Sequence, residues 1–320
     1  MKLSILMIAF YIFNLFFYIM PEINEVRRYA DFLKTKLKNK NITEINIING
    51  RYKKHGPFAL YKQLVKDLPV KVLDIKTKGK FMYMVLSDGY FLFCTLGLSG
   101  GWVYQENRSK KYLHPTILEY LRNADVEAYK KESLNHLNVE FKTVGGSVYF
   151  YDTLSFGTLK VIKNEEELDK KLNTLGPDIM DKSTTFEVFK GQLLKEKNLK
   201  KKIGVVLMDQ KVVSGVGNYL RADILWLSKI SPFRKVNKLT DSEIKDIYHN
   251  GKVLTWGDYD YSKARKEKII TSKDKVPRDY KRDFFVYNEE TDIYGHPVIK
   301  EELYEGSQKR FIYWVKGRQI

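Results

Sequence analysis

Asp209-Gln210-Lys211-Val212-Val213-Ser214-Gly215-Val216-Gly217-Asn218-Tyr219 is the stretch that decides the architecture of this 320-residue chain. It lies in a region, residues 181–256, whose apolar runs are typical of helices. A Gly-x-Gly turn that opens a helix presents backbone N–H groups without intrahelical partners, and such groups bind anions. Asn218 can add a side-chain donor to the same anion. We therefore expect a phosphate-binding helix start at Gly217 and Asn218, although a Gly-x-Gly pair alone is more often just a tight turn.

The region before this helical part is rich in short runs of β-branched and aromatic residues. Pairs such as Asn49-Gly50 and Asp88-Gly89 separate several of these runs and predict turns. Short strands at this spacing indicate an antiparallel sandwich or barrel. The predicted strands are Ile42–Ile48, Val70–Ile75, Phe81–Leu86, Tyr90–Leu96, Asn138–Thr143, Ser147–Tyr151 and Thr158–Ile162. A polar helical stretch over 164–175 and the turn Leu175-Gly176-Pro177-Asp178 then place a domain boundary.

The N-terminal stretch Met20-Pro21-Glu22-Ile23-Asn24-Glu25-Val26 opens an amphipathic helix. Its apolar positions 23, 26, 30, 33 and 37 are spaced 3, 4, 3 and 4 residues apart, which is one face of a helix on a core. Proline suits the first helical position, and Glu22 and Glu25 suit the positive end of the helix dipole. Such a helix start is commonplace in structural roles. It is also what a chain beginning at Met20 would need to expose a proline amine once the methionine is removed.

The apolar leader, residues 3–19, admits two interpretations. Hydropathy alone favours a signal peptide or signal anchor, because about 17 residues approach the length that spans a bilayer. No small-x-small cleavage site precedes Pro21. The other interpretation is an upstream extension that is absent from the active protein.

The overall charge favours a polyanionic partner. Lysine and arginine number 56 against 39 acids, so the formal charge is +17, and nucleic acid or an acidic membrane surface would fit it. A solvated lysine-rich surface explains the same number. Residues 261–282 alone carry nine basic and three acidic side chains. Cys94 is the single cysteine, which excludes a disulfide within the chain.

Two further patterns concern the helical part and the C-terminus. Thr184-x-x-Glu187 and Thr240-x-x-Glu243 both predict capping boxes at helix starts. Phe284–Tyr287 and the run Lys309–Val315 are predicted to be the two strands of a terminal hairpin.

Taken together and in this order, several segments resemble the formamidopyrimidine-DNA glycosylase / endonuclease VIII (Fpg/Nei) family. The segments that carry the resemblance are Met20–Val26, Lys78–Phe81, Leu96–Gly100, Asp152–Gly157, and Asp209–Asn218 with Ser231-Pro232. The resemblance covers nearly all of residues 20–320. It implies an α+β fold of two domains, in which an N-terminal antiparallel β-sandwich with flanking helices precedes a helix-two-turn-helix domain and a β-hairpin finger. The expected limits are 20–162 for the first domain, 163–180 for the linker, 181–265 for the helical domain and 266–320 for the basic loop and finger.

Two departures from the family pattern change what is expected. In most of the family cysteines hold zinc in the finger, but no cysteine follows Cys94 here, and His296 is the only histidine in that region. The finger therefore resembles the zincless variety of the Nei-like branch, and no cofactor is expected. Leu154 and Ser155 stand where the family has two arginines before Phe156, which puts the pairing with the orphaned opposite base in doubt.

The resemblance implies a base-excision repair glycosylase with AP lyase activity that acts on oxidised bases, with pyrimidines favoured. Pro21 would be the Schiff-base nucleophile, Glu22 the acid/base at the sugar, and Lys80 a phosphate clamp, while Glu25 would orient the amine. An α-amino group has an ordinary pKa of ~8, against ~10.4 for lysine, so more of it is unprotonated near neutrality. The DNA contacts would come from the following residues: Gly217, Asn218, Arg310, Leu98 and Phe156.

The expected partner is damaged double-stranded DNA, with single-stranded DNA left open, and the protein is expected to be a monomer. A peptide-bonded proline has no amine to offer, so this reading makes residues 1–19 an extension absent from the active protein. An intracellular location at DNA, nuclear or cytoplasmic, would follow from a start at Met20. The competing hypothesis is a non-catalytic binder of damaged DNA, tethered to a membrane if residues 1–19 are retained.

Overall fold

The computed structural model describes residues 21–107, 112–113, 136–266, 284–305 and 308–320. The leader and most of the basic segment 261–282 lie outside these residues. The chain divides into two compact units, one containing Pro21 and residues 25–171 and the other residues 22–24 and 172–320. No helix of the described residues has the length and apolar composition needed to cross a bilayer.

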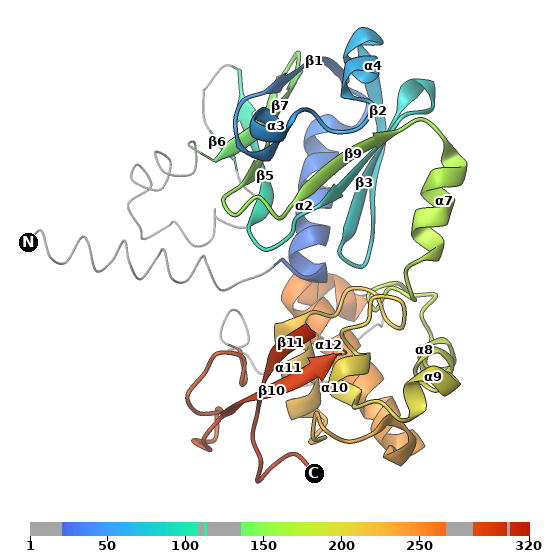
Figure 1. Cartoon of the computed structure of the whole chain (residues 1–320), viewed down its shortest axis with the longest axis vertical. Coiled ribbons are helices and arrows are strands. Elements are labelled where there is room, and N and C mark those ends of the chain that lie inside the picture. Colours follow the sequence, from blue (N-terminus) through green and yellow to red (C-terminus); the bar gives the residue numbers. More distant parts are fainter. Residues whose placement is uncertain (1–20, 108–111, 114–135, 267–283, 306–307) are drawn as a thin grey trace, which may run out of the picture. The chain divides into compact units, whose positions relative to one another are not determined.

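The first unit is built on an antiparallel sheet folded into a sandwich (Figure 1). Its strands run in the spatial order β6-β5-β8-β7-β1-β2-β3-β4-β9. Their bounds are β1 Asn41–Ile47, β2 Val70–Lys78, β3 Phe81–Leu86, β4 Phe91–Thr95, β5 Gly100–Glu106, β6 Tyr112–Leu113, β7 Leu137–Thr143, β8 Gly146–Asp152 and β9 Thr158–Ile162. β1 and β2 share only the pairs Asn41–Lys71 and Ile42–Val70. This short pairing joins the two halves of the sheet.

Helix α2 (Ile23–Leu37) packs on the sandwich core by one face. Val26, Ala30, Leu33 and Leu37 are at most 2% exposed, as the spacing predicted, and Tyr29, which the spacing did not include, is 4% exposed. Burial of each large apolar side chain contributes roughly 1.5–3 kcal/mol. Burial of this apolar face therefore stabilises the helix more than the charged residues on its other faces do.

The other helices among the described residues of the first unit are short. They are α3 (Gly50–His55), α4 (Tyr61–Lys66), the 3₁₀ turn η1 (Ser87–Gly89) and α7 (Glu165–Asn173). The prediction of a helix over 164–175 is thus confirmed, whereas α3 and α4 were not predicted.

Strand prediction succeeded except at the sheet edge. All seven predicted strands are present within one to three residues of their expected ends. β5 and the two-residue β6 were not predicted, and β5 begins with Gly100 and Gly101, a residue type that is depleted in strands. The glycine is required there, since a Cβ at Gly101 would lie 2.4 Å from the hydroxyl of Tyr29 and 2.3 Å from that of Tyr151.

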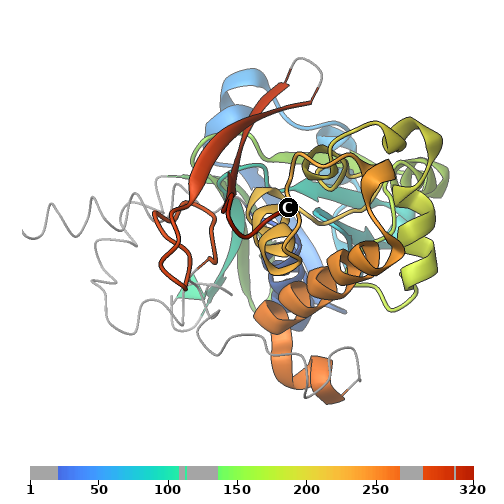
Figure 2. The same ribbon diagram turned by 90° about the horizontal axis from the view of Figure 1, so that it is seen from below.

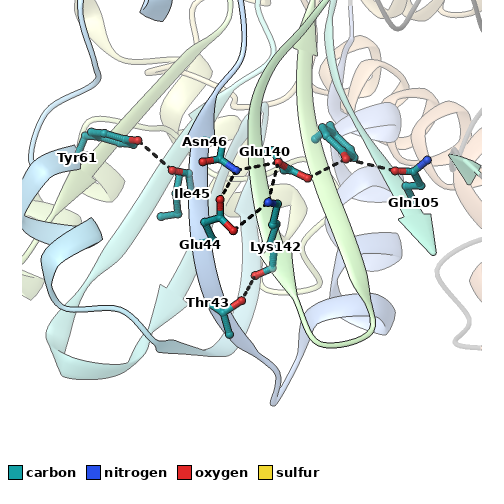
Figure 3. Close-up of polar contacts among 9 residues, drawn as sticks. Thr43, Glu44, Ile45, Asn46, Tyr61, Gln105, Glu140 and Lys142 are labelled. Atoms are coloured by element: carbon teal, nitrogen blue, oxygen red, sulfur yellow. Dashed lines mark hydrogen bonds and ion pairs between the residues drawn. The ribbon is translucent and has the colours of Figure 1, made fainter. Parts of the chain in front are cut away.

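The outer face of β1 and β7 carries a polar network that pairs side chains across the strands (Figure 3). Lys142 Nζ lies 2.9 Å from Glu44 Oε2, and Asn46 Nδ2 donates to both Glu44 (2.7 Å) and Glu140 (3.0 Å). The hydrogen bond from Lys142, and after it that from Asn46, lowers the pKa of the Glu44 carboxyl. Exposed pairs of this kind stabilise little, but they match the β1–β7 register that places Asn46 opposite Glu140.

The second unit is helical, with a terminal hairpin (Figure 2). Its elements are α8 (Phe186–Leu193), α9 (Glu196–Leu199), α10 (Ile203–Val206), α11 (Asn218–Leu227), the 3₁₀ turn η2 (Val236–Lys238), α12 (Asp241–Lys266), β10 (Ile299–Glu305) and β11 (Gln308–Trp314). The core of this unit includes Ile23, the first residue of α2, and Trp226 of α11. α12 bends at Asp260, whose backbone leaves the helical region (Figure 2).

The capping predictions met different outcomes. Thr240 and Glu243 form the reciprocal box: Glu243 N donates to Thr240 Oγ1 (3.3 Å) and Thr240 N donates to Glu243 Oε2 (2.7 Å). At α8 the prediction was wrong by one residue, because Thr185 is the N-cap and accepts from Val188 N. Thr184 is buried, and its carbonyl accepts from Tyr248.

The terminal hairpin has a different first strand from the predicted one. β10, not Phe284–Tyr287, pairs with β11, in a register that sets Leu303 opposite Arg310. Phe284–Tyr287 is apolar because it packs into the helical core, where Phe285 stacks on Trp226 at a centroid distance of 4.7 Å. β10 was not predicted because its glutamates interrupt the apolar pattern by which a strand is recognised in a sequence.

Candidate active site

The start of α11 holds a carboxylate from the far end of the chain. Gly217 is the N-cap, and its N–H donates to Glu22 Oε2 at 2.6 Å. Tyr219 N donates to Glu22 Oε1 at 2.9 Å. Glu22 is fully buried, and the anion that its carboxylate places at this helix start is the protein's own, whereas a phosphate was predicted there.

Gly217 is required by this contact. Its φ of −121° suits any residue, but a Cβ would lie 2.2 Å from Glu22 Oε1. Gly215 is required for a second reason, since its φ of +110° favours glycine and a Cβ there would meet Ile23. Both glycines of the motif therefore allow residues 22–24 to approach α11.

Pro21 and Glu22 precede their helix rather than open it. α2 begins at Ile23, two residues later than predicted, and Glu22 caps α11 instead of its own helix. Glu25 occupies the first turn of α2 and is half-buried, as is Pro21. Pro21 therefore directly precedes Glu22 in the sequence, and two backbone N–H groups hold the Glu22 carboxylate in place.

Asn218, the first residue of α11, has its side chain held by buried neighbours. Arg221 Nη2 donates to Asn218 Oδ1, and Arg221 is only 1% exposed. Burial raises the pKa of the Tyr287 hydroxyl, while a hydrogen bond with the Asn218 side chain opposes that shift. Arg221 was not predicted as a site residue, although a charged residue inside the apolar run Tyr219–Trp226 was a usable signal.

Arg221 also reaches the finger. Its Nη2 donates to the carbonyl of Phe311 at 3.0 Å, and its Nη1 donates to the carbonyl of Gly204 at 2.9 Å. Phe311 follows Arg310, which is half-buried on β11. Asn218 and the strand of Arg310 are therefore joined through one guanidinium group.

The base of the finger is organised by Asp292. Its carboxylate accepts from Tyr294 N (2.9 Å), His296 N (2.9 Å) and Trp226 Nε1 (3.1 Å). The Arg318 guanidinium lies 4.2 Å from the centroid of Trp226. Among the described residues there is no group of three or more His, Cys, Asp or Glu side chains that could hold a metal ion.

In the first unit, Asp152 joins two loops that present apolar side chains. Ser99 Oγ donates to Asp152 Oδ1 at 2.6 Å, and Gly157 N donates to Asp152 Oδ2 at 2.6 Å. The loops touch, because a Cβ at Gly97 would lie 2.6 Å from the nitrogen of Gly157. This clamp brings together the loops that carry Leu98 and Phe156.

Leu98 and Phe156 are exposed, in contrast to a core assignment from hydropathy. Leu98 is 37% and Phe156 59% exposed. Arg51, which was not predicted, donates to the carbonyl of Gly157 at 3.1 Å and steadies the same loop. Lys80 is half-buried in the turn between β2 and β3, where Gly79 has a φ of +57°.

Family models match both units of the chain. The formamidopyrimidine-DNA glycosylase N-terminal domain matches residues 20–159, and the H2TH domain of that enzyme matches residues 175–255. These two matches therefore define a two-domain DNA glycosylase.

The relatives agree. Formamidopyrimidine-DNA glycosylase of Mycoplasma genitalium is 30% identical over 234 residues, 72% of each chain. That of Oceanobacillus iheyensis is 30% identical over 237 residues, 73% of this chain and 74% of the relative. The chain belongs to the formamidopyrimidine-DNA glycosylase family, and it is accordingly an enzyme that acts on damaged bases in DNA during base-excision repair.

Solved structures show the same fold. The Lactococcus lactis enzyme, non-covalently bound to DNA containing an AP site, matches with a TM-score of 0.68 at 21% identity, covering 93% of this chain and 99% of that one. Another Lactococcus lactis complex contains DNA with an oxidized pyrimidine, and a MutM complex contains carbocyclic 8-oxo-G; each matches with a TM-score of 0.68.

Proposed function

We propose that the protein is a bifunctional DNA glycosylase and AP lyase whose nucleophile is the amine of Pro21. The observation that carries this proposal is the buried Glu22 carboxylate, which two N–H groups of α11 hold in the residue next to Pro21. A carboxylate held in this place can accept a proton from the amine.

The chemistry follows from a secondary amine beside a carboxylate. The Pro21 nitrogen attacks the sugar C1′, and the bond from C1′ to the base breaks with its electron pair leaving on the base. Glu22 takes the proton from the attached nitrogen and delivers it to O4′ as the C1′–O4′ bond opens. The nitrogen lone pair then forms the iminium, and Glu22 is again ionised.

The iminium accounts for strand cleavage. Because it withdraws electrons, the C2′ proton becomes acidic, and its loss expels the 3′ phosphate by β-elimination. A second elimination expels the 5′ phosphate, and water releases Pro21 from the sugar fragment. In this scheme Lys80 clamps a phosphate and can donate a proton to it, while Glu25 orients the start of α2 and hence the amine.

The remaining predicted residues hold the DNA. Turning a nucleotide out of the duplex costs a few kcal/mol and leaves a hole in the stack. The exposed side chains of Leu98 and Phe156, on loops clamped by Asp152, fill that hole. Asn218 and Arg310 bind the phosphates, whereas Gly217 contributes by donating its N–H to the Glu22 carboxylate.

The proposal requires that Pro21 be the mature N-terminus. A peptide-bonded proline nitrogen has no available lone pair, so residues 1–19 must be absent from the active protein. The match to the family's N-terminal domain begins at residue 20, which supports a start at Met20 followed by methionine removal.

Borohydride trapping on abasic-site DNA tests this proposal. Protein made from Met20 should form a covalent complex, and mass spectrometry should locate the adduct on Pro21. Pro21→Gly should weaken trapping, and an uncleaved extension before Pro21 should abolish it. Trapping that persists with the extension in place would refute Pro21 as nucleophile, and no trapping at all would leave a non-catalytic binder of damaged DNA.

For the substrate, we propose a preference for oxidised pyrimidines. The zincless finger resembles the Nei-like branch, where that preference is common, and Leu154 and Ser155 in place of two arginines predict weak discrimination of the opposite base. Excision rates on duplexes that each carry one lesion and one opposite base test both points. Fastest removal of 8-oxoguanine paired with cytosine would contradict the preference.

A further inference from the structure

Arg221 is a buried cation, and two of its hydrogen bonds lead to groups at or beside the proposed DNA contacts. It is 1% exposed and donates to Asn218 Oδ1 and to the carbonyl of Phe311, next to Arg310. Burying a guanidinium is costly, and replacing buried ions by apolar side chains of similar size is often neutral or stabilising. Stability alone therefore gives a weak reason for an arginine at this position.

The guanidinium determines how the Asn218 amide is turned. An amide has an oxygen that accepts and a nitrogen that donates, and the two are assigned from their surroundings. A guanidinium has donors only, so the Asn218 oxygen must face Arg221. The amide nitrogen is thereby turned away from Arg221. One of its two N–H groups hydrogen-bonds with the Tyr287 hydroxyl, and the other is able to donate to a phosphate oxygen.

The same guanidinium supports the strand of Arg310. Nη2 is shared between Asn218 Oδ1 and the Phe311 carbonyl, 3.0 Å away. Nη1 adds an anchor on the Gly204 carbonyl of α10 at 2.9 Å. A movement of the Arg221 head group would thus disturb the start of α11 and β11 together.

We propose that Arg221 is a positioning residue for DNA binding, which orients the Asn218 amide toward a backbone phosphate and sets the strand of Arg310 beside it. The inference rests on the proposed function, in which Asn218 and Arg310 grip the phosphates. Arg221 itself touches no DNA, so its effect on affinity passes through its partners.

A double-mutant cycle tests this route. The affinity for a duplex with a tetrahydrofuran abasic analogue is measured for Arg221→Met, Asn218→Ala and the double variant. Arg221→Met should weaken binding by about tenfold, which is the order expected for one mispositioned phosphate contact. In the Asn218→Ala background the same change should weaken binding by less than about threefold, leaving only the part that acts through β11.

Control variants separate positioning from folding. Arg234→Met removes a half-buried arginine of the same unit that pairs with Glu243 at 2.5 Å, and it should lower stability without changing the affinity for DNA. Asn218→Asp keeps the acceptor for Arg221, so it should unfold like the parent protein. It should nevertheless bind DNA at least about tenfold more weakly, since the donor is replaced by a negative charge. If Arg221→Met fails to fold, Arg221→Lys takes its place in the cycle.

Several outcomes would overturn the inference. Unchanged DNA affinity of the folded Arg221 variant would do so, and so would a full effect that simply adds to that of Asn218→Ala. Unchanged affinity of Asn218→Ala would remove Asn218 as a DNA contact and this inference with it. Borohydride trapping through Pro21 reports separately on the proposed function, because it depends on the amine rather than on Asn218.

Discussion

Gly217→Ala is the smallest change that should dislodge Glu22. The added methyl would lie 2.2 Å from Glu22 Oε1 and 2.2 Å from its carboxyl carbon, so the carboxylate has to move. With a φ of −121° the alanine backbone is unstrained. Any effect of the substitution therefore comes from the clash with Glu22.

The size of the effect follows from the two hydrogen bonds that would be lost. Hydrogen bonds to a charged group contribute about 1.5–3 kcal/mol each, so the free energy of unfolding of the second unit should fall by about 3–6 kcal/mol. Trapping on abasic-site DNA should fall by about a hundredfold or more, because the proton acceptor beside Pro21 is displaced.

Tryptophan fluorescence in urea measures the loss of stability, since Trp226, Trp256 and Trp314 all belong to the second unit. Gly191→Ala is a matched control, because a Cβ there has no neighbour within 4 Å and alanine in a helix should stabilise by up to ~1 kcal/mol. Unfolding of Gly217→Ala within about 1 kcal/mol of the parent, with trapping retained, would refute the described hold on Glu22.

Three further predictions concern Asp152, Asp292 and Cys94. Asp152→Ala should release the loops of Leu98 and Phe156 and lower excision from duplex about tenfold while sparing single-stranded substrate, as measured by the ratio of the two rates. Burial opposes ionisation of Asp292, but hydrogen bonds from His296 and others outweigh it and lower the pKa of its carboxyl. The stabilising effect of the ionised Asp292 carboxylate is therefore complete above the ordinary pKa of ~3.9 and is lost as the pH falls below that value. Asp292→Asn should be less stable than the parent protein at pH 7. In acid unfolding the variant should lose less stability between pH 5 and 2 than the parent does. Burial raises the pKa of the Cys94 thiol, so a thiol reagent at pH 8 should react on the order of a hundredfold faster once the first unit unfolds.

Local patterns predicted most of the fold. Alternating and β-branched runs located seven strands, and the 3-and-4 spacing from Ile23 to Leu37 located α2, because both signals come from burial on one face. β10 escaped because glutamates at 301 and 302 weaken the strand pattern of a two-stranded hairpin. Phe284–Tyr287 was wrongly predicted to be a strand, because a buried loop and a strand can have the same apolar composition.

The candidate site was predictable only as a set of residue types. Glu22 lies 195 residues from Gly217 in sequence, and no local rule connects them; the dipole argument assigned Glu22 to the wrong helix. Arg221 and Asp152 acquire their roles from partners that folding brings to them. The family resemblance identified Pro21 and Lys80 as candidate site residues, whereas the hydrogen bonds of Glu22 became known only from the structure.

The bond between Glu22 and α11 has a consequence for how the molecule can be made or divided. Glu22 is synthesised before the N–H groups that it caps, which emerge from the ribosome almost two hundred residues later. A fragment beginning at Leu172 would contain nearly all of the second unit but would leave the start of α11 without its carboxylate. A gene split between the units would therefore leave the start of α11 without its cap. A circular permutation that joins a segment to Pro21 would keep Glu22 but block the proposed amine.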